Sequence, residues 1–595
     1  MRLPQNKYNN KYMNTSTKKG HWIALLLFFT CALSNAPLSF AQDDTLSALN
    51  LPERPNILWL VVEDMSPIIP AYGDNTIETP AISALAEEGV KYTNVYSTSG
   101  VCAPSRAALA LGMYPSSIGA NHMRTTSNTE DTGLPAYEAV PPAQAKMLSQ
   151  YLREHGYYTT NNQKTDYQFQ APKAAWDESS PYAHWRNRPE NKPFFSVFNF
   201  TTTHESGLFE PYGIRQIEFR HYFSDDAERI SNLPHNFSAK TTEQETPQHL
   251  PKDTDFSIPP YLPDTPVVRR DMWKMYNNLA ETDRQIGAII QQLKDDDLYE
   301  DTIIFFYADH GGPLPRQKRL IYDSGLKVPM VIKFPKAQNA GTEDDQLVSF
   351  IDFSPATLAL AGLDEPAHMH GRDFILSSDQ PRKYIHAAAD RFDGFTDVIR
   401  ATKNQRYKYI RNYRPEQGYY LPVVYRERIP TMQELLRLKK AGELNEYQAQ
   451  WFRESKPVEE LFDTIADPHE LNNIAENPEY KEILDELSQE LDRWLADIGD
   501  MPNLPERQLI NQLWQGSEQQ PITSAPEVHM SDGVVSIQSE TNGASIAYKI
   551  IKNKESPESW AVYQGPFKAE SGTEIRTVAH RIGYQENSEI THLVE

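Results

Sequence analysis

Four continuous apolar runs, rich in β-branched and aromatic side chains, constrain the fold more than any other feature of the chain. They occupy residues 56–62, 194–200, 303–308 and 328–334. A strand that is apolar on both faces is typical of a parallel sheet covered by helices on both sides. Amphipathic helices are predicted at 78–90 and 271–294. This alternation predicts an α/β sandwich around a mostly parallel central sheet.

Charged side chains directly follow two of these strands. Glu63 and Asp64 follow the first strand, and Asp309 and His310 follow the third. In open α/β sheets the binding site lies beyond the carboxyl ends of the strands. Two adjacent carboxylates at such an end are costly unless a cation neutralises them. The sequence therefore places a candidate site at this edge, with an exposed, solvated loop as the alternative for the acidic pair.

The 595 residues are too many for one compact core, and the pattern of predicted strands and helices changes along the chain. We expect the sandwich to occupy residues 50–380 and a smaller α+β subdomain to occupy 381–515. Residues 524–595 lack helical periodicity and alternate short strand-like pieces with turns, which indicates an appended β-sandwich module. This module is expected to be a spacer, or else to bind sugar through Trp560 or Tyr563.

The first 41 residues have the pattern of a secretory signal peptide. Lys18 and Lys19 precede an apolar stretch at 22–33, and Ala41 supplies the small residue of a cleavage site. The stretch is shorter than the ~20 residues needed to span a bilayer, so an uncleaved anchor is only the alternative. No later segment is long and apolar enough to span. We therefore expect an exported mature protein without a membrane span, in the periplasm of a Gram-negative bacterium or secreted.

Charge and cysteine content narrow the function classes. The net charge is −23, and loss of residues 1–41 would leave 53 basic against 81 acidic residues. Such a balance argues against nucleic acid as a partner, so an anionic substrate would need a local basic pocket. Of the two cysteines, Cys31 lies in the predicted signal peptide, which leaves Cys102 alone. The mature chain cannot form an internal disulfide, so this thiol is either buried or chemically modified.

The segment from Cys102 to Arg106 has the sequence Cys-Ala-Pro-Ser-Arg and is followed by Gly112. It resembles the Cys-x-Pro-Ser-Arg motif of the type I sulfatases, and the resemblance extends over roughly residues 54–500. It implies an alkaline-phosphatase-like fold and sulfatase activity. It also implies that a formylglycine-generating enzyme converts Cys102 to formylglycine, the nucleophile, whose charge Arg106 stabilises. A chance reactive thiol beside an arginine is the alternative.

The same resemblance implies a metal site. Glu63, Asp64, Asp309 and His310 match the family's metal ligands, and the modified Cys102 completes the coordination sphere. Oxygen-rich coordination suits calcium, with magnesium as the alternative. This chain has Glu63 and His310 where many sulfatases have aspartate and asparagine, and both replacements keep the capacity to bind metal.

Three further residues match the family's sulfate-binding positions. Lys164 and Lys318 correspond to the two lysines that contact the sulfate, and His204 corresponds to the histidine beside the ester oxygen. A histidine there can protonate the leaving alcohol. Asp166 stands where the family has a second histidine, so the base for the sulfate-releasing step is left open.

Four short segments resemble the heparan N-sulfatase-like and ulvan-active bacterial branch of the sulfatase family, namely residues 63–67, 183–189, 203–206 and 459–473. This resemblance implies hydrolysis of sulfate esters on oligosaccharides of a sulfated polysaccharide, with ulvan as the first candidate. Fucoidan, carrageenan, and heparan O- or N-sulfate are alternatives. The expected substrate-binding residues are His122, Arg124, Arg319 and Arg391, because an anionic sugar needs arginine and histidine beside the sulfate pocket.

Two other classes of function remain open. A phosphoesterase of the same superfamily would share the fold, although its nucleophile would be threonine or serine beside two metal ions. A glycan-binding protein that has lost catalysis would keep the module at 524–595. The complete Cys102 motif argues against both.

Overall fold

The computed structural model describes residues 49–209, 248–377, 381–551 and 559–594. The predicted signal peptide at 1–41 therefore lies outside the described residues.

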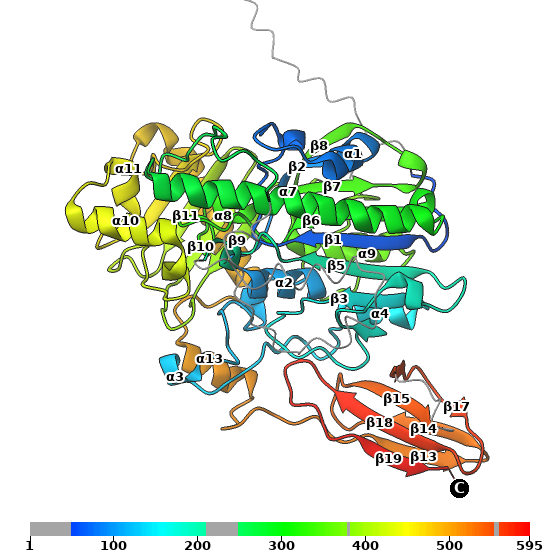
Figure 1. The fold of residues 1–595 in the computed structure, drawn as a ribbon. Helices are drawn as coiled ribbons and strands as arrows, with labels where there is room; N and C mark the ends of the chain where they lie inside the picture. The colour runs from blue at the N-terminus through cyan, green and yellow to red at the C-terminus, as the bar shows by residue number, and fades with distance from the viewer. Residues whose placement is uncertain (1–48, 210–247, 378–380, 552–558, 595) are drawn as a thin grey trace, which may run out of the picture. The chain divides into compact units, whose positions relative to one another are not determined.

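An eight-stranded sheet forms the centre of the first part of the chain (Figure 1), in the order β4-β3-β5-β1-β6-β7-β2-β8. β1 pairs in parallel with β5 and β6, and β3 pairs in parallel with β5. β7 is antiparallel to both of its neighbours. The prediction of a mostly parallel sheet is confirmed, with β7 as the exception. The strands are β1 (Asn56–Val62), β2 (Val90–Tyr96), β3 (Tyr158–Asn162), β4 (Glu178–Ser179), β5 (Phe194–Phe200), β6 (Thr302–Ala308), β7 (Lys327–Lys333) and β8 (Thr342–Ser349).

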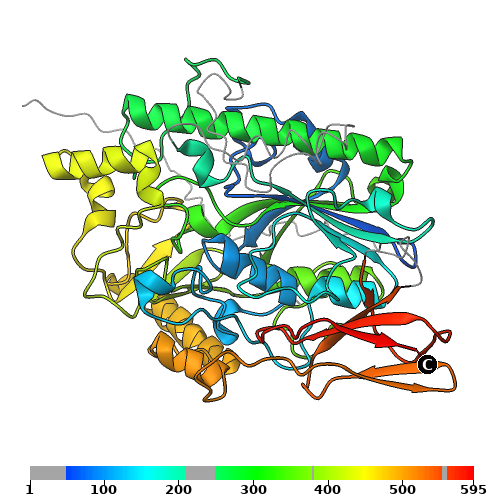
Figure 2. The same cartoon turned by 60° about the horizontal axis from the view of Figure 1, so that its bottom comes forward.

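Helices cover both faces of this sheet (Figure 2), with α1 and α7 on one side and α2, α4 and α9 on the other. α7 begins five residues before the helix predicted at 271–294, because Pro266 starts it and the Thr265 side chain accepts a hydrogen bond from the Val268 amide. None of the described helices is long and apolar enough to cross a membrane. The helices of this part are α1 (Pro80–Glu88), α2 (Cys102–Leu111), α3 (Thr129–Thr132), α4 (Leu148–Glu154), α7 (Pro266–Asp295), α8 (Asp323–Leu326) and α9 (Phe353–Leu360).

β3 is a buried strand that apolar patterning does not reveal. All five of its residues are buried, although its sequence is Tyr-Thr-Thr-Asn-Asn. Hydrogen bonds satisfy these polar groups: the Thr160 hydroxyl donates to Ser196 Oγ at 2.8 Å, and Asn161 Nδ2 donates to Ser179 Oγ at 3.1 Å. The strand matters for function because Lys164 follows its carboxyl end.

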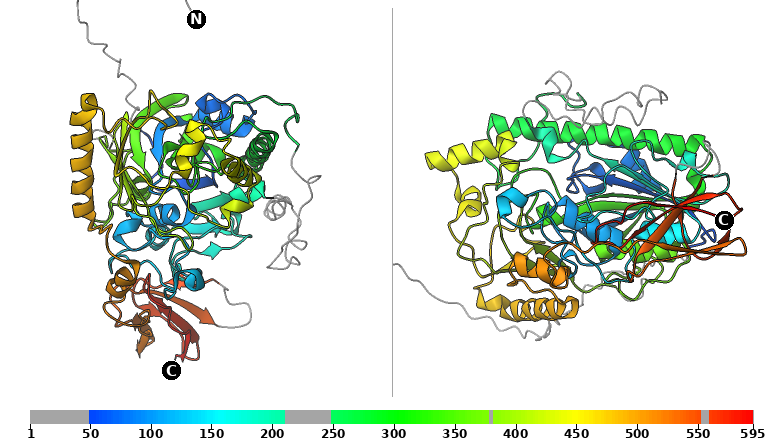
Figure 3. Two further views of the ribbon diagram at one scale, coloured as in Figure 1. Left: turned by 90° about the vertical axis from the view of Figure 1, so that its left-hand side faces the viewer. Right: turned by 90° about the horizontal axis from the view of Figure 1, so that it is seen from below.

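A four-stranded antiparallel sheet, in the order β12-β11-β10-β9, forms a smaller α+β region packed against α12. Two further antiparallel sheets, β13-β14-β17 and β16-β15-β18-β19, make up the C-terminal module (Figure 3, orange to red). The elements are β9 (Ile385–Ala389), β10 (Ile399–Lys403), β11 (Tyr407–Asn412), α10 (Pro430–Ala441), α11 (Glu446–Ala449), β12 (Glu459–Asp463), α12 (Lys481–Ile498), α13 (Glu506–Leu513), β13 (Glu527–Ser531), β14 (Val534–Gln538), β15 (Ser545–Ile551), β16 (Ala561–Val562), β17 (Phe567–Lys568), β18 (Glu574–His580) and β19 (Ile590–Leu593).

The C-terminal module packs closely on the segment between α3 and α4. A Cβ atom on Gly543 would lie 1.9 Å from the carbonyl oxygen of Ala143, so this contact accepts only glycine. Ile582 belongs to a buried cluster that includes Ala107 and Leu111 of α2. The module thus contributes to the core beneath the helix that begins at Cys102. Tyr563 packs against Tyr548 and Phe567 within the module, so its ring is engaged in packing.

Candidate active site

Four neighbouring strands deliver charged residues to one edge of the central sheet. β3, β5, β1 and β6 are consecutive in the sheet and run in the same direction, so their carboxyl ends meet. The residues that follow these strands are, in the same order, Lys164, His204, the pair Glu63 and Asp64, and the pair Asp309 and His310. The sheet topology therefore assembles the cluster that the sequence predicts.

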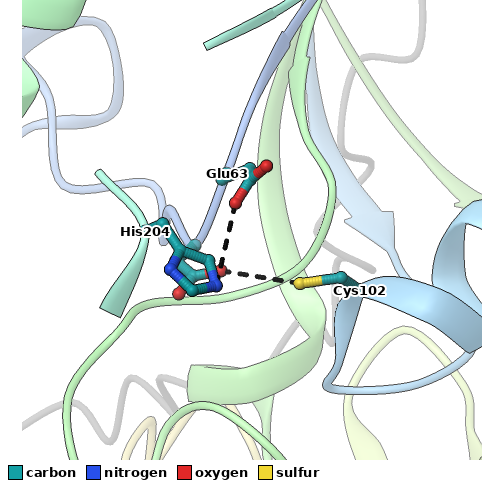
Figure 4. A group of neighbouring side chains, drawn as sticks. Glu63, Cys102 and His204 are labelled. Atoms are coloured by element: carbon teal, nitrogen blue, oxygen red, sulfur yellow. Dashed lines mark hydrogen bonds and ion pairs between the residues drawn. The ribbon is translucent and has the colours of Figure 1, made fainter. Parts of the chain in front are cut away.

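Cys102 is the first residue of α2, and its side chain points toward Glu63 and His204 (Figure 4). Its Sγ lies 3.3 Å from Nε2 of His310 and 4.0 Å from Oδ1 of Asp64. The residue is 2% exposed. The amino end of a helix favours negative charge, which suits a nucleophile that carries such charge during attack.

The turn before α2 is held against the loop at 317–320. The Arg319 amide donates a hydrogen bond to the Gly100 carbonyl at 2.6 Å. A Cβ atom on Gly100 would lie 2.3 Å from the Leu320 carbonyl oxygen, so a larger residue would push this loop away. The turn thereby fixes Lys318 relative to Cys102.

Cationic side chains surround the carboxylates of the site. Lys318 Nζ lies 2.8 and 2.7 Å from the two carboxylate oxygens of Asp64, and His310 Nε2 lies 3.1 Å from its Oδ1. Burial opposes ionisation of Asp64, but the charges of Lys318, His204 and His310 outweigh it and hold its pKa well below the usual value. Asp64 is therefore an anion at neutral pH.

Arg106 connects α2 to the ends of β5 and β6. Its Nε donates to Oδ2 of Asp309 at 3.1 Å, and its Nη1 donates to Oδ1 of Asn199 at 2.6 Å. Burial opposes the charge of Arg106, but Asp309 and Glu63 overcome it and raise its pKa above the ordinary value. The guanidinium is thus a permanent, fixed cation at the floor of the site.

Lys164 and His204 lie on opposite sides of Glu63. Lys164 Nζ is 2.8 Å from Glu63 Oε1, and His204 Nε2 is 3.9 Å from Glu63 Oε2. The Ser206 amide donates to Nδ1 of His204 at 3.2 Å. The Nε2 atom is the ring nitrogen on the side of Glu63. His204 is therefore oriented to donate a proton into the pocket.

The donor atoms fit a hard divalent cation. Ligand atoms of Glu63, Asp64, Cys102 and His204 lie within 4.8 Å of one another, and so do those of Cys102, Asp309 and His310. Three of these residues are carboxylates, and all are buried. The three carboxylates supply the hard oxygen ligands that calcium and magnesium prefer.

A pocket of about 370 Å³ opens over this cluster. Its lining is polar and combines four of the predicted catalytic residues with two arginines, namely Cys102, Lys164, His204 and Lys318 with Arg124 and Arg319. Lys164, Lys318 and Arg319 give it the local positive charge that an anionic substrate needs in an acidic protein. Asp166 also lines the pocket, with its Oδ2 3.7 Å from Lys164 Nζ.

Two of the predicted substrate-binding residues do not line this pocket. Arg391 forms two hydrogen bonds with Glu506, at 2.7 and 2.8 Å, and its amide donates to His122 Nδ1 at 3.2 Å. His122 instead lines a different cavity. Both residues are held in a buried network next to Met123 and Arg124, which do line the pocket.

Sequence reasoning missed Glu205 and Asn199. Both carboxylate oxygens of Glu205 accept hydrogen bonds from Arg319 at 2.8 Å, and the Glu205 amide donates to Asp64 Oδ2 at 2.7 Å. Glu205 directly follows His204, and Asn199 is the polar exception near the end of an apolar strand. A polar residue at the carboxyl end of a buried strand was the available signal for Asn199.

Residues 55–363 match the sulfatase family, and residues 316–427 match the N-sulphoglucosamine sulphohydrolase C-terminal family. The chain belongs to the sulfatase family. This sulfatase is 58% identical over 591 residues to an ulvan-active sulfatase of Formosa agariphila, an alignment that covers 98% of each chain. It is 22% identical to human N-sulphoglucosamine sulphohydrolase over 75% of this chain and 90% of the human one. It is a sulfuric ester hydrolase.

Solved structures share the fold of this sulfatase. The structure of BT4656 in complex with its substrate D-glucosamine-2-N,6-O-disulfate aligns with a TM-score of 0.50 at 18% identity, over 76% of this chain and 99% of that one. The structure of BT1596, a 2-O GAG sulfatase, aligns with a TM-score of 0.50 at 19% identity, over 75% and 93%. The alkaline-phosphatase-like sandwich is thereby confirmed.

Proposed function

We propose that the enzyme removes sulfate esters from oligosaccharides of ulvan. The observation that carries the substrate is the 58% identity, along almost the full length of both chains, to an ulvan-active sulfatase. The polar, cationic pocket above Cys102 supports an anionic saccharide rather than an apolar ester. The reaction converts the ester and water to the free alcohol and hydrogen sulfate.

The proposal includes oxidation of Cys102 to formylglycine by an external formylglycine-generating enzyme. The motif from Cys102 to Arg106 supports this, as does the position of Cys102 at the start of α2. When formed, this residue supplies a nucleophilic oxygen where the structure has Sγ. Arg106, fixed by Asp309 and Asn199, supplies positive charge below this atom.

We assign the metal site to Glu63, Asp64, residue 102, Asp309 and His310, with calcium as the first candidate and magnesium as the second. When bound, the cation supplies a Lewis acid that polarises sulfate oxygens. His204 lies next to this site, because its Nε2 is 3.9 Å from Glu63 and its ligand atom belongs to the same group as those of Glu63, Asp64 and Cys102.

The other side chains of the pocket bind the sulfate and protonate the leaving alcohol. Lys164 and Lys318 both line the pocket, with their ammonium groups beside Glu63 and Asp64 respectively, and bind the sulfate oxygens. His204 donates the proton on Nε2 to the oxygen of the leaving alcohol. Arg124 lines the pocket mouth, where it contacts Asp393 and lies over the Tyr425 ring. Arg319 is held by Glu205 and contributes charge to the wall.

The proposal includes export of the protein. The pattern at residues 1–41 supports cleavage and release to the periplasm or the medium, where a polysaccharide fragment is accessible. The division into a catalytic part at 50–380, an α+β subdomain at 381–515 and a module at 524–595 belongs to the same proposal.

The test is desulfation of ulvan, carrageenan, fucoidan and heparan oligosaccharides by the full chain, with the formylglycine content measured by peptide mass. We expect sulfate release from ulvan oligosaccharides that EDTA and Cys102→Ala both abolish. Sulfate release from another glycan alone would replace ulvan as the proposed substrate. A preference for phosphate esters over sulfate esters would overturn the assignment of the reaction.

A further inference from the structure

A second cavity, of about 380 Å³, is lined in part by residues that directly precede part of the lining of the catalytic pocket in the chain. Asn121 and His122 line this second cavity, whereas the next two residues, Met123 and Arg124, line the pocket around Cys102. Its other walls come from β10, from the segment that leads into α13, and from Arg581 of the C-terminal module. We call it the junction cavity, because three parts of the chain meet there.

The acidic residues of the junction cavity already have cationic partners. Asp390 and Asp500 both pair with Arg400, at 2.9 and 2.6 Å. Glu506 pairs with Arg391. These charges are compensated within the protein, so the cavity has no unmet demand for a cation.

Two arginines of the cavity have no carboxylate partner among the described residues. Arg414 donates to the Tyr413 carbonyl at 3.4 Å, and Arg581 donates to the Tyr584 hydroxyl at 3.0 Å. Both side chains line the cavity, so their guanidinium groups are available to an anion that enters it.

The chemistry of these groups defines the missing ligand. Two guanidinium groups suit an anionic acceptor such as a carboxylate or a sulfate. Apolar ring faces of Pro141, Pro142 and other proline side chains line the same cavity and suit the C–H faces of a sugar ring. One chemical class combines these features: a saccharide unit that carries a carboxylate or a second sulfate.

We propose that the junction cavity is a second saccharide subsite that binds an anionic sugar unit of the oligosaccharide whose sulfate occupies the catalytic pocket. The inference rests on the proposed function, because it takes the substrate to be an oligosaccharide. It assigns a binding role to Arg414 and to Arg581, and so gives the C-terminal module a part in substrate recognition.

The test measures binding by calorimetry to full-length Cys102→Ala protein, which cannot turn over. The probes are ulvan oligosaccharides in native form, in desulfated form and in a form whose carboxyl groups are reduced. We expect Arg414→Gln and Arg581→Gln each to weaken binding about tenfold. Arg581→Lys retains the charge and is expected to recover part of this loss. Arg437→Gln removes an exposed arginine of α10 outside both cavities and serves as the matched control.

The three probes identify the anionic group. Loss of the Arg414 and Arg581 effects with the carboxyl-reduced probe assigns a uronate, and loss with the desulfated probe assigns a second sulfate. The proposed subsite is wrong if every probe binds both arginine variants as tightly as the Cys102→Ala protein, or if no probe binds that protein. If the enzyme with full formylglycine content releases no sulfate from ulvan while the arginine variants still lose binding, the proposed substrate fails and the subsite stands.

Discussion

Replacement of Arg319 by methionine tests how the wall of the catalytic pocket is held. Arg319 donates two hydrogen bonds of 2.8 Å to the Glu205 carboxylate, and both side chains are almost fully buried. Lys318 lies 3.4 Å from the same carboxylate but is already engaged by Asp64. Arg319→Met therefore leaves Glu205 as a buried, poorly compensated anion.

The expected loss is about 3–5 kcal/mol, the usual result of breaking a buried ion pair from one side. For a chain of this length the entropy of unfolding converts this loss to a fall in Tm of about 3–4 °C. Adding Glu205→Gln to Arg319→Met removes the stranded charge, so the double variant is expected to regain at least half of the lost Tm. The coupling between the two sites is then the regained free energy, about 2 kcal/mol or more, plus the loss that Glu205→Gln causes alone.

The assay is thermal unfolding of the full chain, followed by circular dichroism and by differential scanning fluorimetry. Arg437→Gln, which removes an exposed arginine paired with Glu434 on one helix, is the control and is expected to leave Tm unchanged. The reasoning is refuted if Arg319→Met lowers Tm by less than about 1 °C, or if the double variant shows the simple sum of the two single losses.

Three further outcomes are expected. Calcium is expected to raise Tm by about 2 °C at a concentration one hundred times its Kd, and EDTA to reverse this; no shift with calcium or magnesium would count against the metal site. Burial raises the pKa of Asp271 to about 6, despite hydrogen bonds from Thr431, so its carboxyl contributes stability below about pH 4 that is lost as pH rises through 6, about 3 kcal/mol in all. Asp271→Asn should therefore gain Tm relative to the parent between pH 4 and 7, and a constant difference would contradict this. Ile582→Asp is expected to lower both Tm and kcat/KM because it places a charge in the cluster beneath α2, whereas Ile582→Val should cost only about 1 kcal/mol; equal losses in the two variants would argue against this packing role.

The central strands and the cluster at their ends could be predicted from the sequence because both signals are local. A continuous apolar run identifies β1, β5 and β6, and the charged pairs follow these strands directly. β3 was not predicted because its buried polar side chains form hydrogen bonds with a neighbouring strand: Thr160 donates to Ser196, and Asn161 Oδ1 accepts from Asn199. That compensation becomes visible only when the sheet order is known.

The substrate-binding residues were harder to predict than the catalytic ones. Arg124 and His122 are separated by one residue in the chain, yet they line different cavities. His122 accepts a hydrogen bond from the Arg391 amide, and Arg124 pairs with Asp393, so partners more than 250 residues later in the chain hold both side chains. Charge alone marks an arginine as a candidate, but long-range packing decides whether it reaches the substrate.

The burial of Cys102 also limits when this residue can be modified. Its Sγ is enclosed only after His310 arrives, and 208 residues separate the two in the chain. At a synthesis rate of about 5–20 residues per second, that stretch takes about 10–40 s to emerge. The conversion proposed for Cys102 is expected within this interval, before His310 packs against its Sγ. The separation of Cys102 and His310 in the chain therefore limits the time in which Cys102 can be modified.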